Sequence, residues 1–131
     1  MAVFLNEYGR LPMQVTVFGD WTNRGDILAT LLPNGANAII WCGCRANVAG
    51  IRAWAGARRL KFHAILFDFT RDGYAAPTLC YRRAAKKAVF LIAAWDGSRG
   101  PMLDAIYYAQ SGGVRCRVLW DMDTPSERLG V

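Results

Sequence analysis

The sequence predicts an α/β fold in which helices cover both faces of a mostly parallel, five-stranded sheet. Five short runs rich in Val, Ile, Phe and Trp alternate along the chain with segments whose apolar residues recur at helical spacing. Most of these runs are close to continuously apolar, as expected for strands that are covered on both faces. The chain of 131 residues is long enough for one such domain and contains no linker-like stretch or internal repeat.

The boundaries of the elements follow from this alternation. The predicted strands cover residues 14–19, 36–43, 62–69, 88–95 and 114–122. The predicted helices cover residues 25–33, 47–59, 77–87 and 101–111. Asn34-Gly35 and Gly112-Gly113 follow two of the helices and are typical stop signals, and Pro101 suits the first turn of the last helix.

The order of the elements predicts a Rossmann-like three-layer sandwich with strand order 3-2-1-4-5, because parallel crossover connections are right-handed. We expect residues 1–131 to form a single domain, with residues 1–13 and 122–131 peripheral to it. Sheets of this kind bind ligands beyond the carboxyl ends of the strands, where the strand order reverses. Function is therefore expected at the corners where strands lead into helices.

Composition and charge exclude several classes of protein. A hydrophobic content of 53% argues against a disordered chain, and every apolar run is too short to cross a membrane. The first residues, MAVFLNEYGRLPM, lack the features of a signal peptide, which predicts a cytoplasmic protein. The net charge is +6, and thirteen of the 16 basic residues are arginines, so anionic partners are favoured.

The cysteines and the single histidine give little sign of a metal. Cys42, Cys44, Cys80 and Cys116 are expected to be free thiols in a reducing compartment. Cys42 and Cys44 are too close in sequence for an ordinary zinc pair, and His63 lies in a strand-like run. The sequence therefore predicts neither a metal site nor a cofactor.

Glycine-containing corners after three of the strands hold the candidate ligand-binding residues. The corner DGSRGP precedes a helix, whose first N–H groups and positive dipole end point toward the corner. Its glycines permit close backbone approach, its serine can donate a hydrogen bond, and its arginine can pair with an anion. This combination is typical of a phosphate cradle, although the ending of a Walker A loop is absent. The residues assigned to ligand binding are Gly19, Asp20, Trp21, Gly43, Cys44, Arg45, Asp96, Gly97, Ser98, Arg99 and Gly100.

Aromatic residues allow two interpretations. Trp21, directly after the first strand, could stack on a base or could simply pack in the core. Trp54, Tyr107 and Tyr108 are candidates for exposed aromatics at a homodimer interface.

Three segments resemble one protein family: FGDWTNRGDILATLL, IIWCGCRANVAGIRAWA and AAWDGSRGPMLDAIYYAQSGGVRCRVL. In that order they are similar to the short Rossmann-like proteins of the SLOG superfamily. That superfamily also includes the LOG-type phosphoribohydrolases and the nucleotide-fold domain of DprA-type proteins. The resemblance spans about residues 14–120 and is strongest at WDGSRGP, where Pro101 stands in place of the usual threonine.

The chain departs from the family pattern elsewhere. Asp20-Trp21 replaces the usual Ser-Arg, and the glycines expected after the second strand stand as Cys42, Gly43 and Ala46. In LOG-type enzymes, an arginine and a glutamate cleave the N-glycosidic bond of nucleoside monophosphates. The counterparts that the resemblance implies are Arg82 in LCYRRAA and Asp104 in GSRGPMLD.

Three functional hypotheses follow. The first is a sensor or sequestering protein that binds a nucleotide or a nucleotide-derived molecule. The second is a phosphoribohydrolase that uses Asp104 and Arg82. The third is a nucleic-acid-associated protein, which the sequence pI of 9.5 allows. The altered corners favour binding over catalysis, because transition-state stabilisation tolerates less displacement of the site residues.

Overall fold

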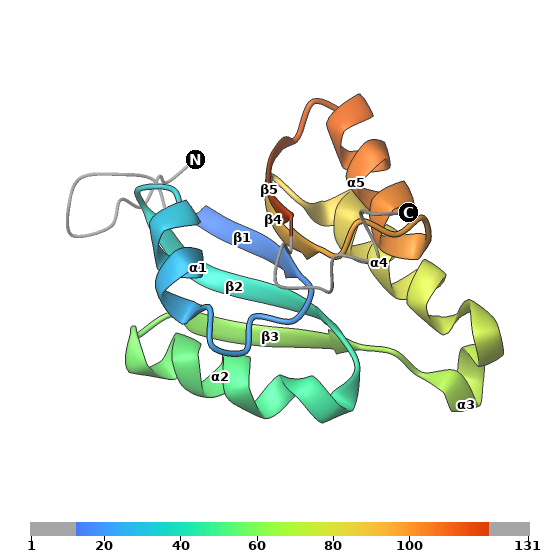
Figure 1. The fold of residues 1–131 in the computed structure, drawn as a ribbon, viewed down its shortest axis with the longest axis horizontal. Coiled ribbons are helices and arrows are strands. Elements are labelled where there is room, and N and C mark those ends of the chain that lie inside the picture. Colours follow the sequence, from blue (N-terminus) through green and yellow to red (C-terminus); the bar gives the residue numbers. More distant parts are fainter. Residues whose placement is uncertain (1–12, 121–131) are drawn as a thin grey trace, which may run out of the picture.

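A computed structural model describes residues 13–120, and its fold confirms the predicted α/β class. Five parallel strands form one sheet in the order β3-β2-β1-β4-β5 (Figure 1). The strands are β1 (Met13–Phe18), β2 (Ala36–Gly43), β3 (Lys61–Leu66), β4 (Phe90–Trp95) and β5 (Arg115–Trp120). The main helices are α1 (Gly25–Leu31), α2 (Val48–Ala57), α4 (Ala76–Lys87) and α5 (Pro101–Ser111). The predicted order 3-2-1-4-5 is therefore correct, and the sheet is entirely parallel over the described residues.

Two hydrophobic clusters hold the three layers together. Helices α1 and α2 cover one face of the sheet, and α4 and α5 cover the other (Figure 1). Successive side chains of β1 point to opposite faces of the sheet. Val15 and Val17 belong to the cluster that contains Leu28 of α1, and Phe18 belongs to the cluster that contains Ile106 of α5. All of these side chains are fully or almost fully buried. The continuous apolar run of β4 thus has the cause expected from the sequence, which is burial on both faces.

Several element boundaries differ from the prediction, and local chemistry explains two of them. Helix α1 ends at Leu31, not at residue 33, because Pro33 disfavours a helical conformation at the residue before it. Leu32 is accordingly extended, with ψ of 135°. The third strand ends at Leu66, not at residue 69, because Asp68 caps a short helix, α3 (Phe69–Asp72), by accepting a hydrogen bond from the Arg71 N–H at 3.0 Å.

The remaining boundaries within residues 13–120 differ from the prediction by at most two residues. One turn of 3-10 helix precedes α2 and another, Gly73–Ala75, joins α3 to α4. Residues 121–122 of the predicted fifth strand lie outside the described residues, as do the predicted peripheral segments except Met13, which begins β1. Within residues 13–120, no helix is long and apolar enough to span a membrane.

Candidate functional site

The carboxyl ends of the three central strands lie side by side at one edge of the sheet. Phe18, at the end of β1, is aligned with Cys42 of β2 and with Ala93 of β4. Strand order reverses between β1 and β4, because the chain adds β2 and β3 on one side of β1 and then crosses over to add β4 and β5 on the other side. The corners that follow β1, β2 and β4 therefore meet at the position where parallel sheets bind ligands.

A cavity of about 370 Å³ lies at this edge, and we call it the central cleft. Its walls come from the corners after β1, β2 and β4, from the start of α5 and from the first half of α4. Eight of the predicted ligand-binding residues line it: Gly19, Asp20, Gly43, Cys44, Asp96, Ser98, Arg99 and Gly100. The other lining residues were not predicted from the sequence, and they include Trp41, Asn47, Phe67, Pro77, Tyr81, Trp95 and Met102.

The corners after β1 and β4 contain the same kind of hydrogen-bonded turn. The Asp96 carboxylate accepts hydrogen bonds from the Ser98 N–H at 2.9 Å and from the Ser98 hydroxyl at 2.5 Å. The Asp20 carboxylate accepts from the Thr22 N–H at 2.9 Å and from the Thr22 hydroxyl at 2.6 Å. An aspartate that bonds the backbone two residues later stabilises a tight turn. Asp20 and Asp96 therefore shape two of the corners that line the cleft.

The corner after β4 leads into the amino-terminal end of α5. Helix α5 begins at Pro101, whose ring fits the first helical position, and it runs for 11 residues. The first backbone N–H groups of such a helix have no partner within the helix and carry partial positive charge. The exposed Arg99 stands before this helix and forms no ion pair with any residue from 13 to 120. The corner thus combines a guanidinium with a helix amino terminus, as the sequence predicted.

A second cavity, of about 250 Å³, opens between the β1–α1 loop and α2, and we call it the tryptophan pocket. Trp21, Trp41 and Trp54 line it together with Leu28 and Ile51. Each indole N–H donates to a backbone carbonyl: Trp21 to Phe18 at 3.0 Å, Trp41 to Gly19 at 3.0 Å, and Trp54 to Gly25 at 3.1 Å. With these polar groups bonded elsewhere, the pocket presents mainly carbon atoms.

The tryptophan pocket and the central cleft adjoin each other. Gly19, Asp20, Trp41 and Asn47 line both cavities. The pocket is apolar, whereas the cleft contains the arginine and the helix terminus. The two neighbouring cavities therefore suit an aromatic group and an anionic group, respectively.

Other predicted site residues lie outside the central cleft. Trp21 is only 6% exposed and packs in the core. It lines the tryptophan pocket described above but not the central cleft. Arg45 is exposed and lines a different depression with Phe67 and Asp68. Gly97 has a φ of +89°, and a side chain there would meet the Trp120 indole at 2.9 Å, so this glycine accommodates Trp120.

The candidate catalytic residues do not line the central cleft. Asp104 is exposed in the first turn of α5, and Arg82 is exposed on α4. Neither residue lines the central cleft or the tryptophan pocket. Within residues 13–120, no three His, Cys, Asp or Glu side chains cluster in a way that could hold a metal ion.

The candidate interface aromatics divide into two groups. Trp54 is half-buried in the tryptophan pocket, so the expectation that it is an exposed aromatic was wrong. Its indole lies against Gly25 and beneath the Arg58 guanidinium, which stands 4.9 Å from the ring centroid. Tyr107 and Tyr108 are exposed on α5 and stay candidates for a homodimer surface.

No family model matches this chain, and no curated protein is significantly similar to it.

Proposed function

We propose that this protein binds a nucleotide or a nucleotide-derived molecule as a sensor or sequestering protein. The observation that carries the proposal is that an apolar, tryptophan-lined pocket adjoins a cleft that contains Arg99 and the amino terminus of α5. A nucleotide has the matching form, with a planar base at one end and phosphate at the other. The resemblance to the SLOG superfamily points to the same class of ligand.

The phosphate is expected at the start of α5. Backbone N–H groups at a helix amino terminus bind anions by hydrogen bonding and by the helix dipole. Arg99 can add a charge-assisted, two-pronged hydrogen bond to phosphate oxygens. The turns that Asp20 and Asp96 form with Thr22 and Ser98 already satisfy part of the hydrogen-bonding capacity of both carboxylates, which reduces their repulsion of an anion.

The base is expected in the tryptophan pocket. Contact between a base and an aromatic side chain contributes roughly 1–3 kcal/mol. The two cavities, of about 250 and 370 Å³, are each close to the lower end of the range for small-molecule sites, which is about 300–1,000 Å³. Asn47 lines both cavities. Its side-chain NH2 donates to the Cys44 Sγ at 3.4 Å, and its side-chain oxygen can accept a hydrogen bond from the base or the sugar.

A thermal-shift screen tests this proposal, because a ligand that binds only the folded protein raises its melting temperature. The screen compares nucleoside mono-, di- and triphosphates, cyclic nucleotides and ADP-ribose with nucleosides alone and inorganic phosphate alone. A ligand that fills both cavities stabilises the protein more than either of its parts. If no nucleotide raises the melting temperature, the proposed function is wrong.

We expect Arg99→Ala to weaken binding of the best nucleotide by about 1–3 kcal/mol, the contribution of a hydrogen bond to a charged group. Isothermal titration calorimetry measures this loss. Arg82→Ala is the matched control, because it removes the same charge from an exposed position outside both cavities. Equal losses in the two variants would indicate a general effect of charge and would contradict a phosphate site at Arg99.

The position of Asp104 and Arg82 favours binding over N-glycosidic cleavage, since neither side chain reaches the proposed ligand. We expect no free base when the protein is incubated with AMP, GMP, CMP or UMP and the products are separated by chromatography. Base release that Asp104→Asn abolishes would establish the phosphoribohydrolase alternative instead.

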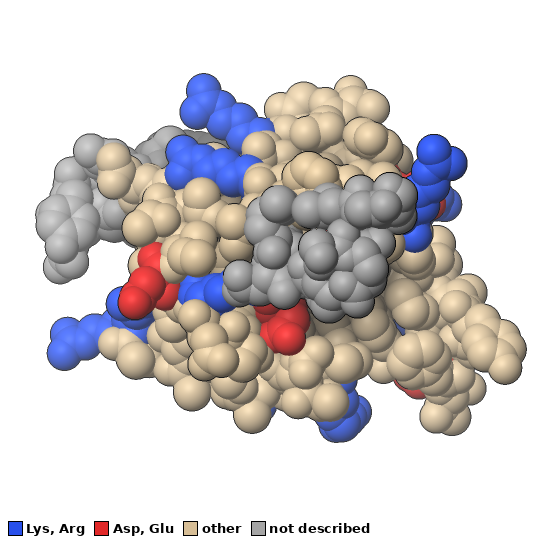
Figure 2. All heavy atoms as spheres, in the orientation of Figure 1, with Lys and Arg blue, Asp and Glu red and all other residues tan. Residues whose placement is uncertain are grey.

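A nucleic-acid partner has less support. The Lys and Arg side chains visible in Figure 2 lie in several separate places and form no single patch on that face. Binding along a nucleic-acid backbone requires several cations on one surface.

A further inference from the structure

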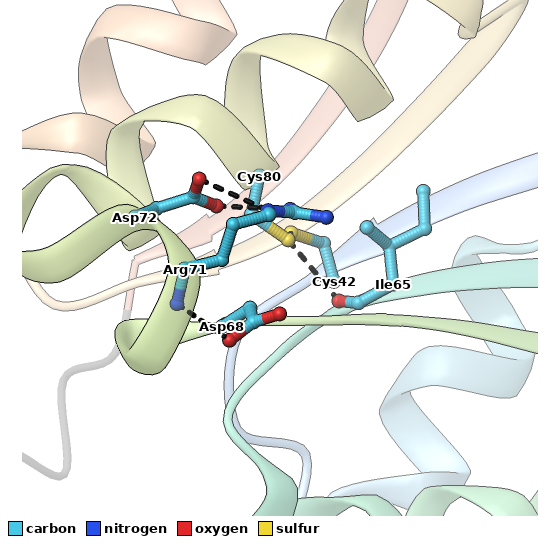
Figure 3. A network of polar contacts seen from close by, with 6 residues as sticks. All are labelled: Cys42, Ile65, Asp68, Arg71, Asp72 and Cys80. Carbon is cyan, nitrogen blue, oxygen red and sulfur yellow. Dashed lines mark hydrogen bonds and ion pairs between the residues drawn. The ribbon is translucent and has the colours of Figure 1, made fainter.

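Two buried cysteines face each other between the sheet and α4. Cys42 belongs to β2 and Cys80 to α4, and their Sγ atoms lie 2.7 Å apart although the residues are 38 positions apart in sequence (Figure 3). Cys42 is fully buried and Cys80 is 4% exposed. The Cys80 thiol also contacts the Ile65 carbonyl oxygen at 3.2 Å. A disulfide has an S–S length of about 2.05 Å, so bond formation requires only a small further approach of the two sulfur atoms.

The surroundings of the pair favour ionisation of one of the two thiols. The hydrogen bond from Cys42 lowers the pKa of Cys80, and the positive charges of Arg83 and Arg71 lower it further. Together these three effects outweigh burial, which raises the pKa. The same hydrogen bond and burial raise the pKa of Cys42. Asp72 opposes ionisation of Cys80, but it is held in a two-pronged ion pair by Arg71, with N–O distances of 3.0 and 2.9 Å. Cys80 is therefore the thiol that loses its proton first.

The pair adjoins the proposed ligand site on two sides. Cys42 itself lines the central cleft, and Gly43 and Cys44 follow it. Pro77 and Tyr81, which lie before and after Cys80 on α4, line the wall that α4 contributes to the same cleft. A covalent bond between the two sulfur atoms would join these walls.

We propose that Cys42 and Cys80 form a reversible disulfide that makes ligand binding in the central cleft sensitive to peroxide. The disulfide itself depends only on the geometry of the pair, whereas its effect on binding rests on the proposed function. Because the bond draws the end of β2 and α4 together, oxidation narrows the cleft and lowers affinity for the nucleotide.

The chemistry requires one molecule of hydrogen peroxide. The Cys80 thiolate attacks a peroxide oxygen, the O–O bond breaks, and the released hydroxide takes up a proton to become water. Sulfur is thereby oxidised to a sulfenic acid. The Cys42 sulfur then attacks the Cys80 sulfur, and the sulfenic hydroxyl leaves as a second water with the Cys42 proton. Two thiols and one peroxide yield one disulfide and two waters, and a dithiol reductant reverses the reaction by exchange.

Oxidation of the full chain tests the disulfide directly. After treatment with one equivalent of peroxide, we expect a mass loss of about 2 Da, that of two hydrogen atoms, and a fall from four titratable thiols to two under denaturing conditions. Peptide mapping should join Cys42 to Cys80. The melting temperature should rise by about 10 °C, because the bond restricts a long loop in the unfolded chain. Dithiothreitol should restore the starting mass and melting temperature.

Variants separate this pair from the other two thiols. The Cys44→Ser/Cys116→Ser double variant keeps the pair and should still lose about 2 Da and gain thermal stability. Cys80→Ser should do neither, and Cys80→Ala provides a second version in case the serine destabilises the fold. A disulfide that contains Cys44 or Cys116, or a thiol count that peroxide leaves at four in folded protein, would overturn the proposal.

The effect on binding has its own measurement. Affinity for the best nucleotide from the screen should fall at least about fivefold on oxidation of the wild-type protein and recover with dithiothreitol, a change well above calorimetric error. It should stay constant in peroxide-treated Cys80→Ala. Unchanged affinity in the oxidised wild type would refute the regulatory part alone. If no nucleotide binds at all, the regulatory part fails with the proposed function, and mass and melting temperature still decide whether the disulfide exists.

Discussion

Trp41→Ala is expected to lower the free energy of unfolding by about 3–5 kcal/mol, the usual range for removing a buried aromatic side chain. Trp41 is 2% exposed and packs with residues of β1, α1, α2 and β4. Its indole N–H donates to the Gly19 carbonyl, and that carbonyl loses its partner when the side chain is removed. Urea denaturation followed by circular dichroism measures the loss.

Two further variants serve as comparisons for Trp41→Ala. Trp41→Phe keeps an aromatic ring but has no N–H, so we expect a smaller loss of about 1–3 kcal/mol from the unpaired Gly19 carbonyl and the reduced volume. Tyr107→Ala, at a side chain that is 59% exposed on α5, should change stability by less than about 0.5 kcal/mol. A Trp41→Ala protein as stable as Tyr107→Ala would contradict the buried position of Trp41.

Gly19→Ala is expected to cost about 2–4 kcal/mol of stability and to weaken nucleotide binding at least tenfold, because two separate constraints require glycine at this position. Gly19 has a φ of +101°, which side-chain-bearing residues rarely adopt. An added Cβ atom would also lie 2.5 Å from the Ala94 carbonyl oxygen of β4, so the β1–α1 loop would have to move. That loop lines both the central cleft and the tryptophan pocket.

Gly56→Ala is the matched control for this substitution. Gly56 lies in α2, and an added methyl group meets no atom within 4 Å. Alanine is the better helix former, so this variant should gain about 0.5–1 kcal/mol in the same denaturation experiment. Opposite signs for the two changes would support the close approach of the β1–α1 loop to β4, and equal effects would count against it.

The sequence alone was enough to predict the fold class and the strand order. These features follow from local patterns, namely apolar runs of strand length, helical spacing between them and the handedness of parallel crossovers. The corner before α5 could be located for the same reason, since Asp96, Ser98 and Arg99 are neighbours in the chain and lie next to the start of that helix. Its role as a phosphate cradle stays a prediction. Asp68 is a local signal that was missed, because an aspartate before Phe69 also fits the end of a strand.

Only the tertiary structure decided which distant residues meet. The tryptophan pocket brings together Trp21, Trp41 and Trp54 from a loop, a strand and a helix, and no spacing in the sequence indicates that contact. The fold also separates Asp104 and Arg82 from the cleft, although both lie on helices that border it. Cys42 and Cys80 show the physical reason most plainly. A residue's position along its helix or strand fixes which face it occupies, but the packing of α4 against β2 determines that these two sulfur atoms lie 2.7 Å apart.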